Sequence, residues 1–180
     1  MEKCIKQDEM ERENKMPNNN ILMENARIGF RNFSGLAGMY NAKGQRNFCV
    51  FLESDLAAKL SEDGWNVKVL PAREEGDLPQ AYLQVSVRFE NVPPKIVMIT
   101  RGGKTPLNEQ SIDKLDTAAF SNVDLIVTPY EWTVNGKSGI KAYLKTLFVT
   151  LAEDELESKY ADFVERPDSA YNAPTEDSGN

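Results

Sequence analysis

The chain has 180 residues and a mass of 20.2 kDa, which is enough for one domain and hardly for two. With 41% apolar residues, 27% charged residues and a net charge of −7, it has a globular composition, and no apolar run is long enough to cross a membrane. It has no histidine, which excludes histidine-based catalysis and His-ligated zinc. Its two cysteines, Cys4 and Cys49, are too few for a four-thiolate metal site or a disulfide framework, and they indicate reduced thiols in a cytosol.

Polar segments flank the centre of the chain. Residues 1–20 lack a lasting apolar period and the apolar stretch of a secretory signal, so they predict a flexible polar leader. Residues 164–180 predict a disordered acidic tail. Residues 151–180 hold two basic and nine acidic residues, whereas residues 25–150 hold fifteen basic and thirteen acidic ones. Three roles are open for such an acidic tail: it folds back on a basic surface of the same chain, it recruits a partner, or it only keeps the chain soluble.

The centre of the chain is mostly strand. Apolar and β-branched residues, most of them alternating with polar ones, predict strands over residues 27–33, 47–52, 65–69, 82–90 and 95–100. Helices are expected near residues 54–63, 107–115 and 153–163.

A hairpin is the clearest local prediction. Asn135-Gly136 joins two β-rich runs, residues 123–134 and 138–150, through a type I′ turn, and Pro129 marks a bulge, a bend or an edge position in the first run. Six or seven mainly antiparallel strands with peripheral helices predict an OB-like antiparallel barrel over residues 21–163, with a β-sandwich as the alternative.

Basic and aromatic residues recur together on strands. Arg27 and Arg31, for example, share a predicted face with Phe33. Proteins bind single-stranded nucleic acids with such faces, because cations follow the phosphates and rings stack on bases for about 1–3 kcal/mol each. The alternative is that these rings are core or strand-pairing residues. The candidate nucleic-acid-binding residues are Arg27, Arg31, Arg46, Arg88, Tyr130, Trp132, Lys141, Tyr143 and Lys145.

Catalytic motifs are not convincing. Residues 101–105 end like a phosphate-binding loop, but Met98 stands where that motif needs its first glycine and Pro106 follows, so a flexible basic loop is expected. The acidic clusters fall at expected helix ends and in loops, where solvated charge explains them. We therefore expect no enzyme activity, no metal site and no cofactor.

Several segments together resemble a family of bacteriophage proteins labelled single-stranded DNA-binding-like. The similar segments are Gly29-Phe30-Arg31-Asn32-Phe33-Ser34-Gly35, Tyr40-Asn41, Gly44, Arg46–Val50, Glu62–Lys68, Pro93–Val97 and Asn135–Lys145. The resemblance covers roughly residues 24–163. It implies an OB-fold-type barrel and a cytoplasmic role in phage DNA replication or recombination, inside the host bacterial cell.

Two functions remain open at this point. The first is a phage-type protein that binds single-stranded DNA without catalysis, with host or phage replication and recombination proteins as further partners. The second is an anti-CRISPR protein from a phage or mobile element that inhibits a Cas nuclease by binding the nuclease, its DNA or both. The sequence pI near 4.8 would suit a protein that occupies a basic DNA channel. Both allow a homodimer, and neither involves a membrane.

Overall fold

The computed structural model describes residues 20–153, in which strands predominate. Most of the predicted leader, the expected helix over 153–163 and the acidic tail lie outside these residues. Within them, no helix is both long and apolar enough to span a membrane. The elements are β1 (Ile21–Met23), β2 (Arg27–Asn32), β3 (Arg46–Phe51), α2 (Ser54–Glu62), β4 (Val67–Leu70), β5 (Gln80–Val87), β6 (Lys95–Thr100), β7 (Gly103–Leu107), the 3-10 helix η1 (Ile112–Asp116), β8 (Phe120–Val134) and β9 (Lys137–Leu151).

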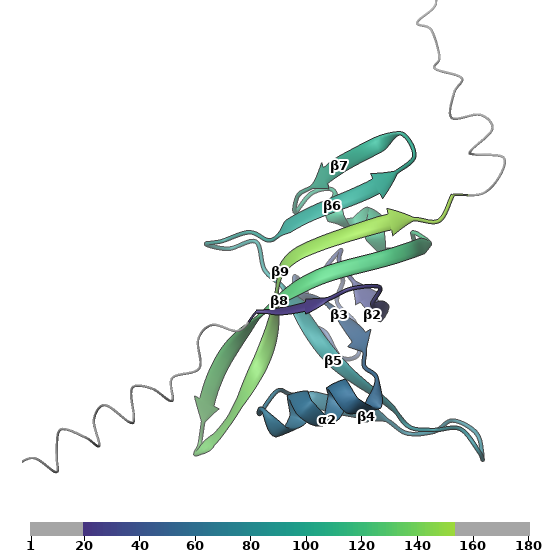
Figure 1. Cartoon of the computed structure of the whole chain (residues 1–180). Helices are drawn as coiled ribbons and strands as arrows, with labels where there is room; N and C mark the ends of the chain where they lie inside the picture. The colour runs from purple at the N-terminus through teal and green to yellow at the C-terminus, as the bar shows by residue number, and fades with distance from the viewer. Residues whose placement is uncertain (1–19, 154–180) are drawn as a thin grey trace, which may run out of the picture.

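The nine strands found in residues 20–153 form one mixed sheet, with the order β1-β8-β9-β5-β3-β2 (Figure 1). β4 adds to β5, and the β6–β7 hairpin adds to β9. β9 pairs in parallel with β5 near Ala142 and with β6 from Thr146 onward, so the prediction of an antiparallel sheet is wrong at these two pairings. Across the described residues β1 and β2, at the two ends of this order, do not pair, so the sheet is open.

The β8–β9 hairpin confirms the predicted turn. Asn135 and Gly136 both have positive φ, 52° and 77°, as a type I′ turn requires, and Val134 pairs with Lys137 across it. On one edge, β8 pairs with β1 over residues 125–127 only. Pro129 lies beyond this pairing, where no described strand adjoins that edge, and this is the expected edge position. The tip of the hairpin extends away from the rest of the sheet (Figure 1).

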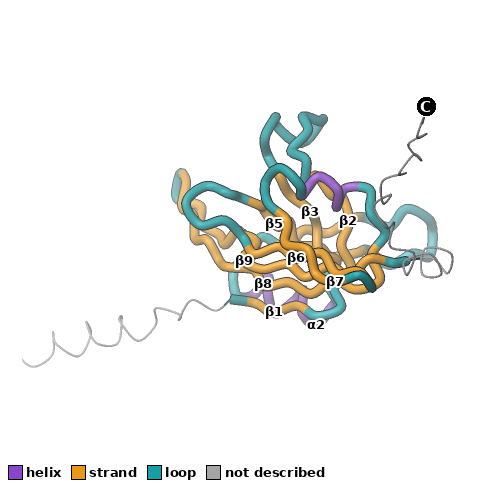
Figure 2. Tube along the Cα trace, turned by 90° about the horizontal axis from the view of Figure 1, so that it is seen from above, coloured by secondary structure: helices purple, strands orange, loops and turns teal. Residues whose placement is uncertain are grey.

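The core lies on one face of the sheet. Phe48, Leu83, Val85, Leu125 and Leu147 are fully buried there, and Ala57 and Leu60 anchor α2, which begins at Ser54 as predicted. Side chains alternate along each strand, so burial of these residues leaves the intervening ones on the other face. Figure 2 shows the strands gathered in the middle of the molecule with loops and helices around them.

The helix expected over residues 107–115 is present only in its second half, as the 3-10 helix η1, and most of the basic loop expected over residues 101–105 is a strand. β7 pairs with β6 in a hairpin, with Leu107 opposite Ile96, and only afterwards does η1 begin. The apolar residues that suggested one helix belong to two elements: Leu107 is buried at the end of β7, and Ile112 is buried in η1. Periodicity in the sequence cannot distinguish this arrangement from a single helix.

Candidate nucleic-acid interface

A polar row crosses three strands on the face opposite the core. Asn47 of β3 is paired with Ser86 of β5, and Ser86 is paired with Tyr143 of β9. The neighbouring row, Phe48–Val85–Ala142, is buried. Because the pleat sends successive side chains to opposite faces, the polar row must face away from the core.

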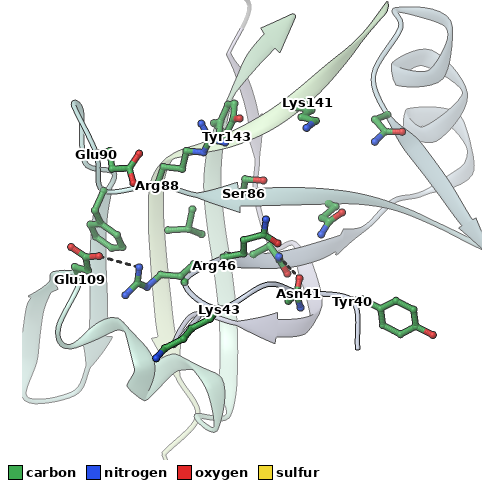
Figure 3. Close-up of a pocket in the computed structure, with 17 residues that line it drawn as sticks. Tyr40, Asn41, Lys43, Arg46, Ser86, Arg88, Glu90, Glu109, Lys141 and Tyr143 are labelled. Carbon is green, nitrogen blue, oxygen red and sulfur yellow. Dashed lines mark hydrogen bonds and ion pairs between the residues drawn. The ribbon is translucent and has the colours of Figure 1, made fainter. Parts of the chain in front are cut away.

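This polar row forms the floor of an open groove of about 690 Å³, shown in Figure 3. Loop residues before β3 and after β5 form its sides. Four basic side chains and two acidic ones line it, so its charge is positive although the whole chain is acidic. The lining includes Tyr40, Asn41, Lys43, Arg46, Asn47, Gln84, Ser86, Arg88, Glu90, Glu109, Lys141 and Tyr143, which together are called the groove below.

A cation and two rings pack together at one end of the groove. The Arg88 guanidinium lies 4.7 Å from the centre of the Tyr143 ring, and Figure 3 shows Arg88 extending toward that ring. The Tyr143 and Tyr130 rings meet edge to face, with centres 5.2 Å apart at 82°. Tyr130 is 53% exposed and is paired with Lys141 across the hairpin. This arrangement offers a ring face and a cation side by side, which suits a base and its phosphate.

Arg46 lies at the opposite side of the groove and is partly neutralised. Its guanidinium forms a 3.0 Å ion pair with Glu109, and it lies 5.6 Å from the Phe89 ring centre. The side chain is only 20% exposed. Beside it, the Asn47 amide donates to Asn41 at 2.7 Å and ties the preceding loop to β3. A phosphate at Arg46 would therefore have to compete with Glu109.

Arg27 and Arg31 line a different hollow, of about 480 Å³. Arg31 donates to the carbonyl oxygens of Leu115 and Ala118, at 2.9 and 2.7 Å, and its guanidinium lies over a ring, so it is engaged in holding η1 and the residues after it. The predicted common face of Arg27, Arg31 and Phe33 is wrong, because a bulge in β2 shifts the alternation and Phe33 is fully buried.

Trp132 and Lys145 do not line the groove. The Trp132 ring lies across Gly139, where an added Cβ would come within 3.0 Å of the indole. Lys145 is exposed at a register shift opposite Ile126 and Val127. Of the nine predicted residues, the structure thus gathers Arg46, Arg88, Lys141 and Tyr143 in the groove, with Tyr130 in contact with Tyr143.

Sequence reasoning missed the neutral polar part of the groove and Lys43. Asn47 sits in an apolar run, and Gln84 and Ser86 are uncharged, so the search for basic and aromatic residues passed over all three. Cys49, which is paired with Gln84 on the same face, is buried. Burial raises the pKa of its thiol, and the charge of Lys68 opposes this shift, so the thiol stays protonated at neutral pH.

The groove is an open, mainly polar surface with a positive charge. Across residues 20–153, no three Cys, Asp or Glu side chains are grouped so that they could hold a metal ion. The comparison with known families identifies the class: the "Putative phage ssDNA-binding domain" matches residues 10–180. The chain belongs to this family, which confirms the resemblance drawn from its segments.

Three solved structures are similar to the chain at low identity. The bacteriophage Enc34 single-stranded DNA-binding protein with a C-terminal truncation is 10% identical, with a TM-score of 0.47 over 75% of this chain and 87% of that one. The Enc34 protein in complex with ssDNA is 12% identical, with a TM-score of 0.47 over 75% and 88%. The single-stranded DNA-binding protein gp2.5 of bacteriophage T7 is 11% identical, with a TM-score of 0.38 over 88% and 100%. No curated protein matches the chain.

Proposed function

We propose that this protein binds single-stranded DNA along the groove and performs no chemistry on it. The observation that carries the proposal is the cluster of Arg88, Tyr143 and Tyr130, with Lys141 beside it. A base can stack on a ring of this cluster, and the two cations can reach the phosphates on either side of that base. Membership of a phage ssDNA-binding family supports the same proposal.

The mainly β sheet serves this function as an OB-like scaffold. In that class of fold, one strand face and the adjoining loops hold the oligonucleotide. Here the equivalent surface is the polar row of β3, β5 and β9 together with the loop before β3. The proposal includes a role in phage DNA replication or recombination within the host cell.

The balance of charge predicts how binding responds to salt. Lys43, Arg88 and Lys141 are the groove cations outside the Arg46–Glu109 ion pair. About three neutralised phosphates give a slope near −2 for the logarithm of affinity against the logarithm of salt on a single strand. Binding should therefore depend moderately on salt, and stacking should supply much of the free energy.

The test is a fluorescence-anisotropy titration of the full chain with a labelled oligonucleotide, single- and double-stranded, at two salt concentrations. We expect preference for the single strand, and a loss of about 5- to 150-fold on Tyr143→Ala, which corresponds to one stacked base. Leu78→Ala, at an 89% exposed side chain outside the groove, is the matched control and should change nothing. If the wild type binds neither form at low salt, the proposal is wrong, and a protein target such as a Cas nuclease becomes the next candidate.

A further inference from the structure

Phe30 has an unusual backbone and an exposed ring. Gly29 pairs with Cys49 and Asn32 with Asn47, so two residues of β2, Phe30 and Arg31, stand opposite a single residue of β3. At this bulge Phe30 has a φ of 48°, in the left-handed region that bulky side chains avoid, and the residue is 56% exposed. A strained bulge that turns an aromatic ring into solvent calls for a functional explanation.

The ring of Phe30 belongs to a small cluster, called here the Phe30 platform, which consists of Phe30, Phe51 and Arg27. The Phe30 and Phe51 rings have centres 6.2 Å apart at 63°, and the Arg27 guanidinium lies 5.0 Å from the centre of Phe51. Gly29 makes room for the platform, because a Cβ at this position would come within 2.8 Å of the Phe51 ring. Like the cluster in the groove, the platform combines two rings and an arginine.

The platform lies on the same sheet face as the groove. Along β3, Asn47, Cys49 and Phe51 alternate with buried core residues, so all three face the same way. Asn47 is at the groove and Phe51 is four residues further on. Lys68 of β4 lies in the same row as Phe51, because both residues pair with Tyr82 of β5. The Phe51 end of this face therefore carries a cation in addition to Arg27.

Sheet geometry gives the separation of the two sites. Four residues along β3 span about 13 Å, and the two strand spacings from β3 to β9 span about 10 Å, so Phe51 and Tyr143 lie about 16 Å apart. At the rise of a stacked strand, about 3.4 Å per nucleotide, this distance corresponds to about five nucleotides. That length falls within the range of about 4–16 nucleotides that one OB-type domain covers.

We propose that the Phe30 platform is a second base-stacking subsite, which holds a nucleobase of the same single strand about five nucleotides from the base at Tyr143. This inference rests on the proposed function of the groove. An exposed ring pair could also dock a protein, but Arg27, Lys68 and the position of the platform on the same sheet face as the groove favour a nucleic-acid strand.

The first experiment compares Phe30→Leu, which keeps an apolar side chain but removes the ring face, with Phe30→Tyr, which keeps the ring. Titrations of the full chain use oligothymidines of about 3 and about 12 nucleotides, the shorter being unable to span about 16 Å even when extended. We expect Phe30→Leu to weaken binding of the longer strand by about 5- to 150-fold, and binding of the shorter one much less. Phe30→Tyr should bind like the wild type. Val92→Ala, at an 84% exposed loop residue, is the control.

The outcomes separate the two proposals. If Tyr143→Leu loses affinity while Phe30→Leu binds the longer strand like the wild type, the platform is not a subsite but the groove stands. If Phe30→Leu changes only the sedimentation coefficient, the platform is a protein surface and the inference is wrong. Failure of the wild type to bind any strand refutes the proposed function itself. Photocrosslinking of wild-type protein to a 5-iodouracil strand needs no variant: crosslinks at Phe30 or Phe51 support the subsite, and crosslinks confined to the groove overturn it.

Discussion

Asp116 fastens the end of β2 to η1, and removing its carboxylate should cost much of the stability of the domain. One carboxylate oxygen accepts from the backbone N–H of Phe33 at 2.6 Å, and the other accepts from the N–H of Ser34 at 3.0 Å. Phe33 is fully buried and directly follows the bulged strand. Asp116→Ala would leave both N–H groups without their acceptor in a part-buried place.

The size of this effect follows from the two hydrogen bonds. A hydrogen bond to a charged group contributes about 1.5–3 kcal/mol, so the pair contributes about 3–6 kcal/mol. The site is only part-buried, and water can reach the freed N–H groups, so we expect about 3 kcal/mol for Asp116→Ala. Asp116→Asn keeps one acceptor oxygen and should lose about 1–2 kcal/mol.

Urea denaturation followed by circular dichroism measures this loss. With a slope of about 2 kcal/mol per M, Asp116→Ala should lower the midpoint by about 1.5 M, with little change in the slope itself. Asp113→Ala, at an exposed side chain of the same 3-10 helix, is the control and should stay within about 0.5 kcal/mol of the wild type. A midpoint for Asp116→Ala equal to that of Asp113→Ala would show that the two hydrogen bonds do not stabilise the fold.

Three further predictions concern the groove, the platform and the buried thiol. Lys141→Gln should make the salt slope of single-strand binding shallower by about 0.7, measured by anisotropy at several salt concentrations, and an unchanged slope would mean that Lys141 contacts no phosphate. Gly29→Ala should lower the free energy of unfolding by about 1–3 kcal/mol, because the new Cβ meets the Phe51 ring, and a urea midpoint at the wild-type value would contradict this. Cys49 should resist iodoacetamide at neutral pH until the protein unfolds, as read from the mass of its peptide. The pKa of this thiol is higher in the folded chain than in the unfolded chain, where it keeps its ordinary value of about 9. The protonated thiol therefore favours the folded state at neutral pH, and this contribution to the free energy of unfolding is lost as the pH rises above about 9 and through the folded-state pKa.

Local patterns predicted the elements whose cause is local. The Asn135-Gly136 turn, the alternation that became β5 and the helical spacing of Leu56 and Leu60 in α2 all depend on neighbours within a few residues. The parallel pairings of β9 depend on contacts with β5 and β6, far away in the chain, and no pattern within β9 specifies them. For the same reason β7, which pairs with β6, was mistaken for part of a loop.

The candidate site was predictable to the extent that strand alternation held. Arg88 and Tyr143 come from separate segments, both were expected to face outward, and they stack on each other. Arg31 was expected to face outward too, but the bulge at Phe30 sends it to the carbonyls of Leu115 and Ala118. A bulge inserts one extra residue into a strand, so each residue beyond it faces the opposite side of the sheet from the side that simple alternation assigns.

The late position of β9 in the chain governs when a binding surface first exists during synthesis. Lys141 and Tyr143 belong to β9, whereas their neighbours in the groove, on β3 and β5, leave the ribosome about 50 or more residues earlier. Contacts between residues this far apart in sequence form slowly during folding. Until β9 is available, the edge of β5 that pairs with it stays unpaired. A nascent chain therefore gains its basic–aromatic cluster only after β9 has been made, when the strand that completes the sheet also completes the groove.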